Sequence, residues 1–444
     1  MDIIVSKFGG TSMGNAQSIG RVVDIIQKQA KPSVVVVSAA NGITDQLLIL
    51  GFMASRGEKW EEIFKTTIQD RHQGITEELK IDLDLNNKNI EIKNILQGIS
   101  LLQEMSSSSS DHLSSFGERI SSLILWKALE KIGIKTSQFD TRELIMTDDN
   151  YTEANVDFVK TNKLIQENLL SLLQQGQIVV LTGFIGQSNQ GKYSTFGRGG
   201  SDFTGAVVAA ALGAQELQIW TDVDGICSTN PRLVKGAQVI PELSFAEASE
   251  LAYFGAKVLC PKTIAPAIKG NIPIRILNTF NPQANSTLIT EKSQPGLKAI
   301  TFKSEVVIMT IRSGKMLEAH GFLARIFNLF AKHRVVVDVL ATSETSLSLT
   351  INVYPPEKLI QELSEFSEVY CIPHQAIVCL VGDQLFKNNN ILSNLFICLQ
   401  NYSVKMISQG ASERNITFLV NQNEVEEIVK KVYEKLFVKL DARS

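Results

Sequence analysis

The last third of this 444-residue chain contains an internal repeat, which strongly constrains its fold. Residues 321–352 align with residues 390–421 without a gap, at an offset of 69 residues. The Ser-Glu pair at 343–344 recurs at 412–413, and most apolar positions match apolar ones. Each copy has the pattern of a strand, a turn, an amphipathic helix and two strands joined by a polar turn. The repeat therefore predicts one small α+β module present twice.

The first part of the chain follows a different pattern, in which short apolar segments alternate with longer amphipathic ones. The segments 34–37, 178–182 and 217–221 have the composition of buried strands. This alternation favours βαβ units around a largely parallel sheet flanked by helices. Turn-forming residues at 278–296 mark a break. The predicted domains are an α/β domain at 1–295, a first α+β module at 300–370 and a second at 371–444.

Composition argues against several function classes. The net charge is −3, so no general attraction to nucleic acid or anionic membranes is expected. No apolar run approaches the about 18 residues that a membrane helix needs, and the N-terminus lacks the pattern of a secretory signal. The five cysteines are scattered and never spaced as CxxC, so neither a disulfide framework nor a zinc site is predicted. These features predict a cytoplasmic protein.

Two glycine-rich turns between a strand and a helix are candidate anion sites. In residues 7–12 (KFGGTS), glycines allow close backbone approach, helix N–H groups suit a phosphate, and Lys7 adds a cation. Residues 195–204 (TFGRGGSDFT) lead into an Ala/Val-rich helix. Helix capping alone would explain Asp202. It would not require Arg198 together with three glycines, so a functional site is favoured.

Three further motifs are less specific. The two carboxylates in 220–225 (WTDVDG) can hold a metal, bind a ribose or form an Asp-Gly turn. Lys257, in an apolar setting, is either a phosphate contact or a snorkelling lysine. Residues 186–192 have the spacing of a Walker A loop, but Tyr193 replaces the required Ser or Thr and no helix pattern follows, so a hairpin is predicted. The serine run at 106–110 is expected to be a solvated loop with capping capacity.

Residues 7–12, 196–204, 220–232 and 247–261, taken together, resemble the aspartokinases of the amino acid kinase superfamily. The motifs KFGG, GRGGSD and TDVDGI occur in the family's order, and the resemblance extends over nearly the whole chain. The closest likeness is to the monofunctional, lysine-sensitive branch. It implies an α/β amino acid kinase fold followed by two ferredoxin-like ACT modules.

The resemblance implies roles for the positions that match the family's motifs. The implied catalytic residues are Lys7, Asp202 and Lys257. The implied nucleotide contacts are Lys7, Gly9, Gly10, Thr221, Asp222, Cys227, Arg232, Lys257 and Val258. The implied L-aspartate contacts are Thr44, Glu118, Arg198, Gly199, Gly200 and Ser201. Cys227 departs from the family, which often carries an aromatic residue beside the nucleotide at this position.

The implied reaction is phosphorylation of the side-chain carboxylate of L-aspartate, with ATP and Mg2+ as cofactors. A carboxyl group with a pKa of about 3.9 is already ionised at neutral pH, so no general base is needed. Catalysis then consists of aligning two anions and neutralising their charge. No protein ligand for the metal is assigned.

The two repeat copies differ where an effector would bind. Asp338 of the first copy aligns with Ile407, and His320 aligns with Asn389, so a cationic effector would select the first copy. The resemblance implies L-lysine. The expected site residues are Met316, His320, Gly321, Phe322, Leu323, Asp338, Ser343 and Glu344. Alternatively, Asp338 and Glu344 only cap turns. The ACT modules imply a homodimer or a dimer of dimers.

Two other functions remain open at this point. A related kinase could act on a different acidic substrate, such as glutamate or N-acetylglutamate. A catalytically inactive amino-acid sensor could retain the fold. The first differs from an aspartate kinase in substrate profile, and the second in binding ATP without turnover.

Overall fold

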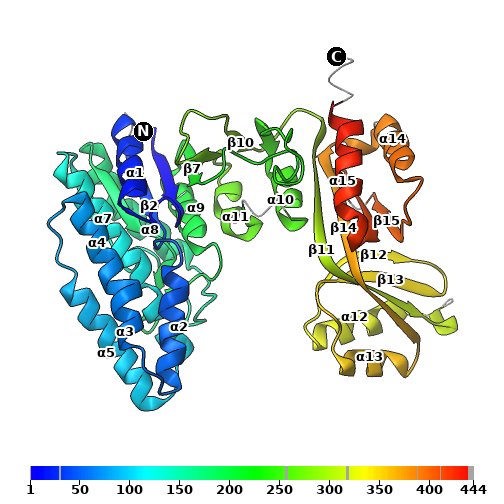
Figure 1. The fold of residues 1–444 in the computed structure, drawn as a ribbon, viewed down its shortest axis with the longest axis horizontal. Coiled ribbons are helices and arrows are strands. Elements are labelled where there is room, and N and C mark those ends of the chain that lie inside the picture. Colours follow the sequence, from blue (N-terminus) through cyan, green and yellow to red (C-terminus); the bar gives the residue numbers. More distant parts are fainter. Residues whose placement is uncertain are drawn as a thin grey trace. The chain divides into compact units, whose positions relative to one another are not determined.

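The computed structural model describes residues 2–29, 32–255, 259–316, 320–387, 389–410 and 412–438. The chain divides into two compact units (Figure 1). The first unit comprises Met1–Ile226, Val239–Phe245 and Leu259–Lys292. The second comprises Cys227–Gln238, Ala246–Val258 and Ser293–Ser444. The domain ranges 1–295, 300–370 and 371–444 stay predictions.

The first unit is built on an eight-stranded sheet with the order β3-β4-β2-β1-β7-β9-β10-β8. Among these strands, neighbours are parallel except for β9 and β10. The strands are β1 (Ile4–Phe8), β2 (Ser33–Val37), β3 (Thr136–Phe139), β4 (Ile178–Thr182), β7 (Glu216–Thr221), β8 (Glu242–Ser244), β9 (Ile274–Asn278) and β10 (Thr287–Thr290). Every residue of β2 and β4 is buried, as expected of parallel strands covered on both faces.

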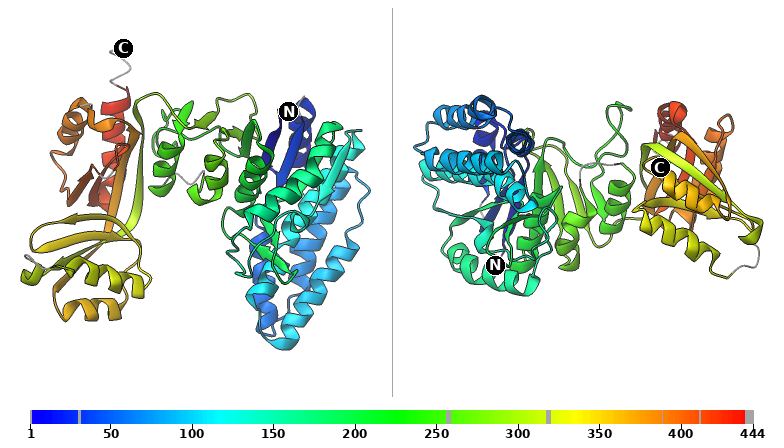
Figure 2. Two further views of the ribbon diagram at one scale, coloured as in Figure 1. Left: turned by 180° about the vertical axis from the view of Figure 1, so that it is seen from behind. Right: turned by 90° about the horizontal axis from the view of Figure 1, so that it is seen from below.

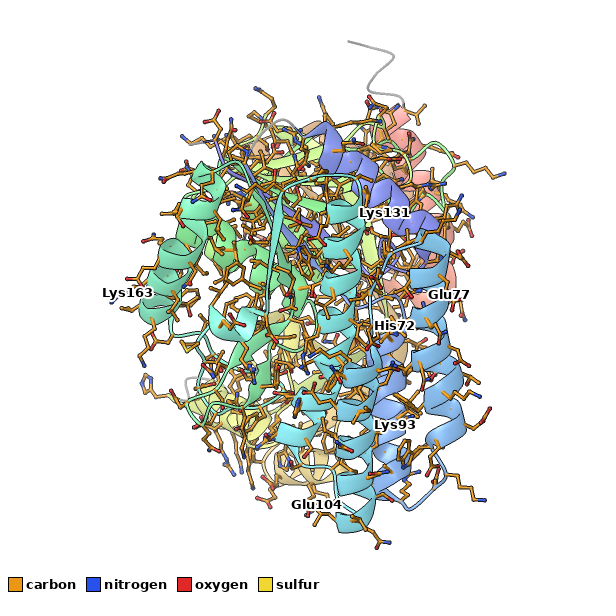
Figure 3. The ribbon with its side chains drawn as sticks, turned by 90° about the vertical axis from the view of Figure 1, so that its left-hand side faces the viewer. His72, Glu77, Lys93, Glu104, Lys131 and Lys163 are labelled. Carbon is orange, nitrogen blue, oxygen red and sulfur yellow. The ribbon has the colours of Figure 1, made fainter. Side chains whose placement is uncertain are left out.

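Helices pack around this sheet and extend beyond it. They are α1 (Ala16–Lys28), α2 (Ile43–Ser55), α3 (Glu61–Phe64), α4 (Asp70–Leu79), α5 (Asn86–Leu102), α6 (Ser107–Ser114), α7 (Phe116–Lys131), α8 (Phe158–Gln174), α9 (Gly200–Leu212) and α11 (Pro261–Lys269). Figure 3 shows α4, α5 and α7 in one helical layer. Lys131 of α7 donates to the Leu79 carbonyl at the end of α4 over 2.9 Å, which ties these helices together.

The structure confirms the strands predicted for this unit and corrects one predicted loop. The strands predicted at 34–37, 178–182 and 217–221 are confirmed as β2, β4 and β7. The Walker-like segment is a hairpin of β5 (Ile185–Gln187) and β6 (Tyr193–Thr195), as predicted, although its first strand starts at Ile185 and not at the predicted Val179. The prediction that the serine run is a loop was wrong. The Ser106 side chain accepts the Ser109 N–H, and this cap starts helix α6 within the run.

The second unit contains a six-stranded sheet with the order β12-β13-β11-β14-β16-β15. Its strands are β11 (Gly296–Arg312), β12 (Val337–Thr342), β13 (Ser346–Ile351), β14 (Glu368–Asp383), β15 (Met406–Gln409) and β16 (Asn415–Asn421). Its described α-helices are α10 (Phe245–Tyr253), α12 (Phe322–Lys332), α13 (Glu357–Ser364), α14 (Asn389–Leu399) and α15 (Val425–Tyr433). All described pairings in this sheet are antiparallel.

The predicted duplication is confirmed, since β11-α12-β12-β13 recurs as β14-α14-β15-β16. Long antiparallel pairing between β11 and β14 joins the two copies in one sheet, which the repeat did not predict. In Figure 2, the yellow helices of the first copy and the orange and red helices of the second lie toward opposite ends of this sheet. Over the described ranges, none of the helices has the length and apolar character needed to cross a membrane.

Candidate active site

A cavity of about 540 Å3 opens in the first unit, where strands β1, β2 and β4 end. The carboxyl ends of parallel strands are the usual ligand site in open α/β sheets. Nine residues predicted from the sequence line it: Lys7, Gly10, Thr44, Glu118, Arg198, Gly199, Gly200, Ser201 and Asp202. The fold therefore brings together residues that are up to about half the chain apart in sequence.

Lys7 and Asp202 form an ion pair at this cavity. The Lys7 Nζ lies 2.7 Å from the Asp202 Oδ1, and the two side chains are only 11% and 16% exposed. Asp202 lies in the first turn of α9, where a carboxylate is favoured by the helix dipole. The pair fixes the lysine ammonium at the end of β1, beside the glycine turn.

The glycines before α9 are required by close packing. Gly199 precedes the helix with a φ of 78°, and a Cβ there would lie 2.7 Å from Thr263 Cγ2. A Cβ on Gly200 would lie 2.5 Å from a ring carbon of Phe184. Since any side chain would clash, these two positions need glycine, and the backbone borders the cavity directly.

Glu118 is a buried carboxyl group in the first turn of α7, with the residue only 4% exposed. The Ser201 hydroxyl donates to Glu118 Oε1 over 3.4 Å. Burial raises the pKa of Glu118 to about 7, although the Ala39 and Glu118 N–H groups, Ser201 and the Lys7 charge oppose this rise. The group can therefore exchange a proton near neutral pH.

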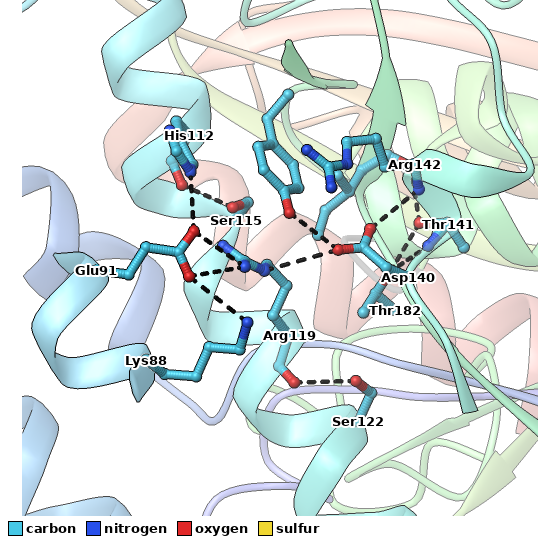
Figure 4. A network of polar contacts seen from close by, with 12 residues as sticks. Lys88, Glu91, His112, Ser115, Arg119, Ser122, Asp140, Thr141, Arg142 and Thr182 are labelled. Atoms are coloured by element: carbon cyan, nitrogen blue, oxygen red, sulfur yellow. Dashed lines mark hydrogen bonds and ion pairs between the residues drawn. The ribbon is translucent and has the colours of Figure 1, made fainter. Parts of the chain in front are cut away.

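A charged network supports helix α7, which carries Glu118 (Figure 4). The buried Arg119 guanidinium lies 3.0 Å from Glu91 on α5 and 3.6 Å from Asp140, and it stacks over two aromatic rings. Burial pushes the pKa of Glu91 upward. The hydrogen bond from His112 and the charge and hydrogen bond of Arg119 outweigh that effect and hold it at about 2. The network thus links α5, α6 and α7 next to the cavity.

The structure describes most of the predicted nucleotide contacts, but not all of them. Thr221 ends β7 and donates to Asp222 over 3.2 Å, next to β1 in the sheet. Cys227, which is half-buried, and Arg232, which is exposed, belong to the second unit. Lys257 and Val258 lie outside the described residues. The Gly9 N–H donates to the Trp220 carbonyl over 3.0 Å.

Asp111 and Thr152 are among the cavity residues that were not predicted from the sequence. Asp111 on α6 is 1% exposed and lines the cavity together with Thr152. Asp111 follows a serine run, where an aspartate has the pattern of an ordinary helix residue. Thr152 has a φ of 73°, which its sequence does not signal. Neither position carried a motif that could have identified it.

The predicted effector residues lie in the second unit, around the first repeat copy. Gly321, with a φ of 81°, precedes α12, whose first residues are Phe322 and Leu323. Met316 ends a 3-10 turn, and the exposed His320 comes just before Gly321. Ser343 and Glu344 are exposed in the turn between β12 and β13, where the Ser343 hydroxyl accepts the Ser346 N–H over 3.2 Å.

Asp338 of β12 pairs with side chains of other elements rather than capping a turn. Its side chain is 1% exposed, and its Oδ2 lies 3.0 Å from the Lys303 Nζ. The Tyr253 hydroxyl donates to its other oxygen. An ammonium group of the protein therefore already occupies this carboxylate.

Comparison with known proteins identifies the class of this chain. Residues 2–278 match the amino acid kinase family, and residues 378–436 match an ACT domain. The chain therefore belongs to the amino acid kinase family.

Within that family it belongs to the aspartokinases. It is 36% identical over 452 residues to the lysine-sensitive aspartokinase 3 of Escherichia coli (strain K12), covering 98% of this chain and 99% of that protein. It is also 36% identical to the chloroplastic aspartokinase 3 of Arabidopsis thaliana, covering 98% of this chain and 81% of that protein. The crystal structure of E. coli aspartokinase III in complex with aspartate and ADP has a TM-score of 0.84 at 35% identity, covering 98% of this chain and all of that one. The complex with lysine and aspartate has a TM-score of 0.79 at 36% identity, with the same coverage.

Proposed function

We propose that this protein transfers the terminal phosphoryl group of ATP to the side-chain carboxylate of L-aspartate, giving 4-phospho-L-aspartate and ADP. The observation that carries this proposal is the charge pattern of one cavity. It combines the Lys7–Asp202 pair, the buried carboxyl of Glu118 and the exposed guanidinium of Arg198. This pattern complements an amino acid with a second carboxylate.

In the proposed complex, Glu118 accepts the α-ammonium of the substrate, with Thr44 beside it. The planar guanidinium of Arg198 suits the α-carboxylate, because it can donate two parallel hydrogen bonds. The side-chain carboxylate then points toward Lys7. This assignment gives substrate contacts to Glu118, Arg198 and Lys7, while the carboxyl groups of Asp45 and Asp111 also line the cavity.

The reaction requires alignment and charge neutralisation. An oxygen of the aspartate side chain attacks the γ-phosphorus, and the bond from that phosphorus to the bridging oxygen of ADP breaks. Lys7 neutralises the transferring group, Asp202 holds Lys7 in place, and Lys257 is proposed to assist. No proton transfer is needed, because both the nucleophile and the departing ADP are anions.

The nucleotide is proposed to contact Gly9, Gly10, Thr221 and Asp222, together with Cys227, Arg232, Lys257 and Val258. Within the described residues, no group of three or more His, Cys, Asp or Glu side chains is placed to hold a metal ion. Mg2+ is therefore proposed to enter with ATP, where it would offset phosphate charge.

Hydroxylamine trapping tests the reaction directly, because an acyl phosphate is converted to a hydroxamate. Purified protein with Mg-ATP and L-aspartate is expected to form aspartyl hydroxamate, and L-glutamate serves as the matched control. A hydroxamate with glutamate but not aspartate would overturn the proposed substrate. ATP binding without any hydroxamate would favour the inactive sensor.

L-Lysine is the proposed feedback inhibitor, with a site around Asp338 in the first repeat copy. The E. coli relative is named as lysine-sensitive, and its solved complex includes lysine. Asp338→Ala is expected to keep the uninhibited rate and to lose inhibition by L-lysine in the trapping assay. Unchanged inhibition in this variant would reject the site.

A homodimer, or a dimer of dimers, is proposed through the ACT modules. Strands β12 and β15 form the two edges of the six-stranded sheet, and sheet edges are natural pairing surfaces. Light scattering after size-exclusion chromatography should show at least twice the chain mass. A cytoplasmic location stays a prediction.

A further inference from the structure

Asp111 joins two separate segments of the cavity wall through its carboxylate. Its Oδ2 accepts the N–H groups of Thr152 and Thr195, each over 2.9 Å. Its Oδ1 accepts the Thr195 hydroxyl over 2.8 Å. Asp111, Thr152 and Thr195 all line the cavity. A single buried side chain on α6 therefore holds both the 148–155 loop and the end of β6.

The loop held by Asp111 has a constrained backbone. Thr152 has a φ of 73°, a conformation that a β-branched residue adopts only where its surroundings enforce it. Other bonds close the loop: Asp148 accepts the N–H groups of Asn150 and Asn155, and the Ala154 N–H donates to the Thr195 carbonyl. The bond to Asp111 is the one made by the N–H of Thr152 itself.

The same bonds also constrain the backbone turn that carries Arg198. Thr195 ends β6 and lies three residues before Arg198. Between them, Gly197 has a φ of 71°, and a Cβ there would lie 3.1 Å from the Thr152 carbonyl oxygen. The 148–155 loop therefore packs directly against the backbone that carries Arg198. A shift of Thr152 would therefore act on the backbone turn that carries Arg198.

We infer that Asp111 is a positioning residue, which holds Thr152 and the Arg198 turn in the geometry that binds the α-carboxylate of the substrate. This inference rests on the proposed function, in which Arg198 contacts L-aspartate. Asp111 itself touches neither reacting group, so its loss should affect aspartate binding more than ATP binding.

Three variants test this positioning role by steady-state kinetics. Asp111→Ala is expected to raise the aspartate KM about tenfold, with the Mg-ATP KM within about twofold of wild type. Asp111→Asn keeps an acceptor for both N–H groups and should recover most of the affinity. Thr152→Gly, added to Asp111→Ala, puts at this position a residue that adopts a positive φ without strain. The double variant should therefore have a lower aspartate KM than Asp111→Ala.

Several results would overturn the inference. An unchanged aspartate KM in folded Asp111→Ala would do so, as would equal rises in both KM values or a double variant no better than Asp111→Ala. If Asp111→Ala does not fold, Thr195→Val removes one of the three bonds, and a rise in the aspartate KM of about threefold is expected. An unchanged KM there also refutes the role. Failure of the proposed function would instead appear in the wild type, as no hydroxamate with L-aspartate.

At the predicted effector site, protein side chains already bind the Asp338 carboxylate. Asp338 is nearly inaccessible because Lys303 of β11 and Tyr253 of α10 occupy its two oxygens. The Lys303 Nζ also lies 5.4 Å from the centre of the Tyr253 ring. These side chains form a cluster within the second unit, and the Asn352 side chain donates to Asp338 Oδ1 over 3.5 Å. The ammonium of L-lysine is the same chemical group as that of Lys303.

We propose that Lys303 acts as an internal competitor of L-lysine for Asp338. This also rests on the proposed function, which places the effector at this carboxylate. An effector would have to displace the Lys303 ammonium before it could bind, so the concentration required for inhibition includes the cost of breaking the internal pair. Lys303 thereby sets the sensitivity of the sensor.

Lys303→Met keeps the length of the side chain and removes its charge. The half-inhibiting concentration of L-lysine is expected to fall about tenfold, and L-lysine should raise the melting temperature more than in wild type. Lys298→Met, on the same strand, is the control and should behave as wild type. An unchanged or higher half-inhibiting concentration would reject the competition. A wild type that neither binds nor responds to L-lysine would instead reject the effector.

Discussion

The buried carboxyl of Glu118 makes the affinity for aspartate depend on pH. The proposed complex needs Glu118 ionised, because only the carboxylate pairs with the α-ammonium. Burial raises the pKa of this group from 4.5 to about 7 in the free protein. A proton therefore competes with the substrate at and below neutral pH.

The size of the effect follows from a single competing proton. With the pKa at about 7, about 9% of the sites are protonated at pH 8 and about 91% at pH 6. The aspartate KM should therefore rise about tenfold between pH 8 and pH 6. The substrate carboxyls and its amine do not titrate in this window, so the change reports on the protein.

The assay is the aspartate KM at saturating Mg-ATP, measured from pH 5.5 to 8.5. Glu118→Gln should show a raised KM that is flat with pH. Glu143→Gln, which changes an exposed carboxyl, should keep the wild-type profile. A flat profile in the wild type, or a tenfold slope retained in Glu118→Gln, would refute the reasoning.

The same pKa shift affects folding stability. Between pH 4.5 and about 7 the folded protein retains a proton that the unfolded chain releases. The contribution of Glu118 is therefore fully present below pH 4.5 and is lost as the pH rises through about 7. At 1.36 kcal/mol per pKa unit the loss is roughly 3 kcal/mol. Chemical denaturation should show that Glu118→Gln gains stability relative to wild type from pH 5 to pH 8.

Substitutions at two cavity residues, and at Gly183, which packs against the cavity residue Ser201, test the rest of the site. Lys7→Ala should lower kcat about a hundred- to a thousandfold, roughly 3–4 kcal/mol, with an unchanged circular dichroism spectrum; near-normal turnover would contradict its role. Arg198→Ala should mainly raise the aspartate KM, and Arg198→Lys should restore only part of the affinity, because an ammonium lacks the planar fork; equal effects on the Mg-ATP KM would argue against the assignment. A Cβ on Gly183 would lie 2.6 Å from Ser201 Cβ, so Gly183→Ala should cost about 1–3 kcal/mol in thermal unfolding. An unchanged melting temperature would show that the backbone there can move.

Local chemistry was readable from the chain. The repeat at an offset of 69 residues predicted two copies of one module, because each copy must bury the same apolar pattern. The strands at 34–37 and 178–182 were visible as short apolar runs. Lys7 and Arg198 were identified because each stands in or next to a glycine turn between a strand and a helix.

Long-range pairing was decided only by the tertiary structure. Asp111 bonds to Thr195, which is 84 residues away, and Lys303 pairs with Asp338, which is 35 residues away. Neither pairing leaves a periodic or compositional signal, since one carboxylate in a helix or strand reads like another. The single sheet that joins both repeat copies through β11 and β14 was likewise not predicted.

The sequence by itself thus determined the elements, the duplication and the residue types available to the cavity. The structure decided which carboxylates are buried, and burial is what raises the pKa of Glu118 and encloses Asp338. The physical reason is that hydrophobic periodicity is encoded over a few neighbouring residues. Desolvation and ion pairing depend instead on segments that meet only after the chain has folded.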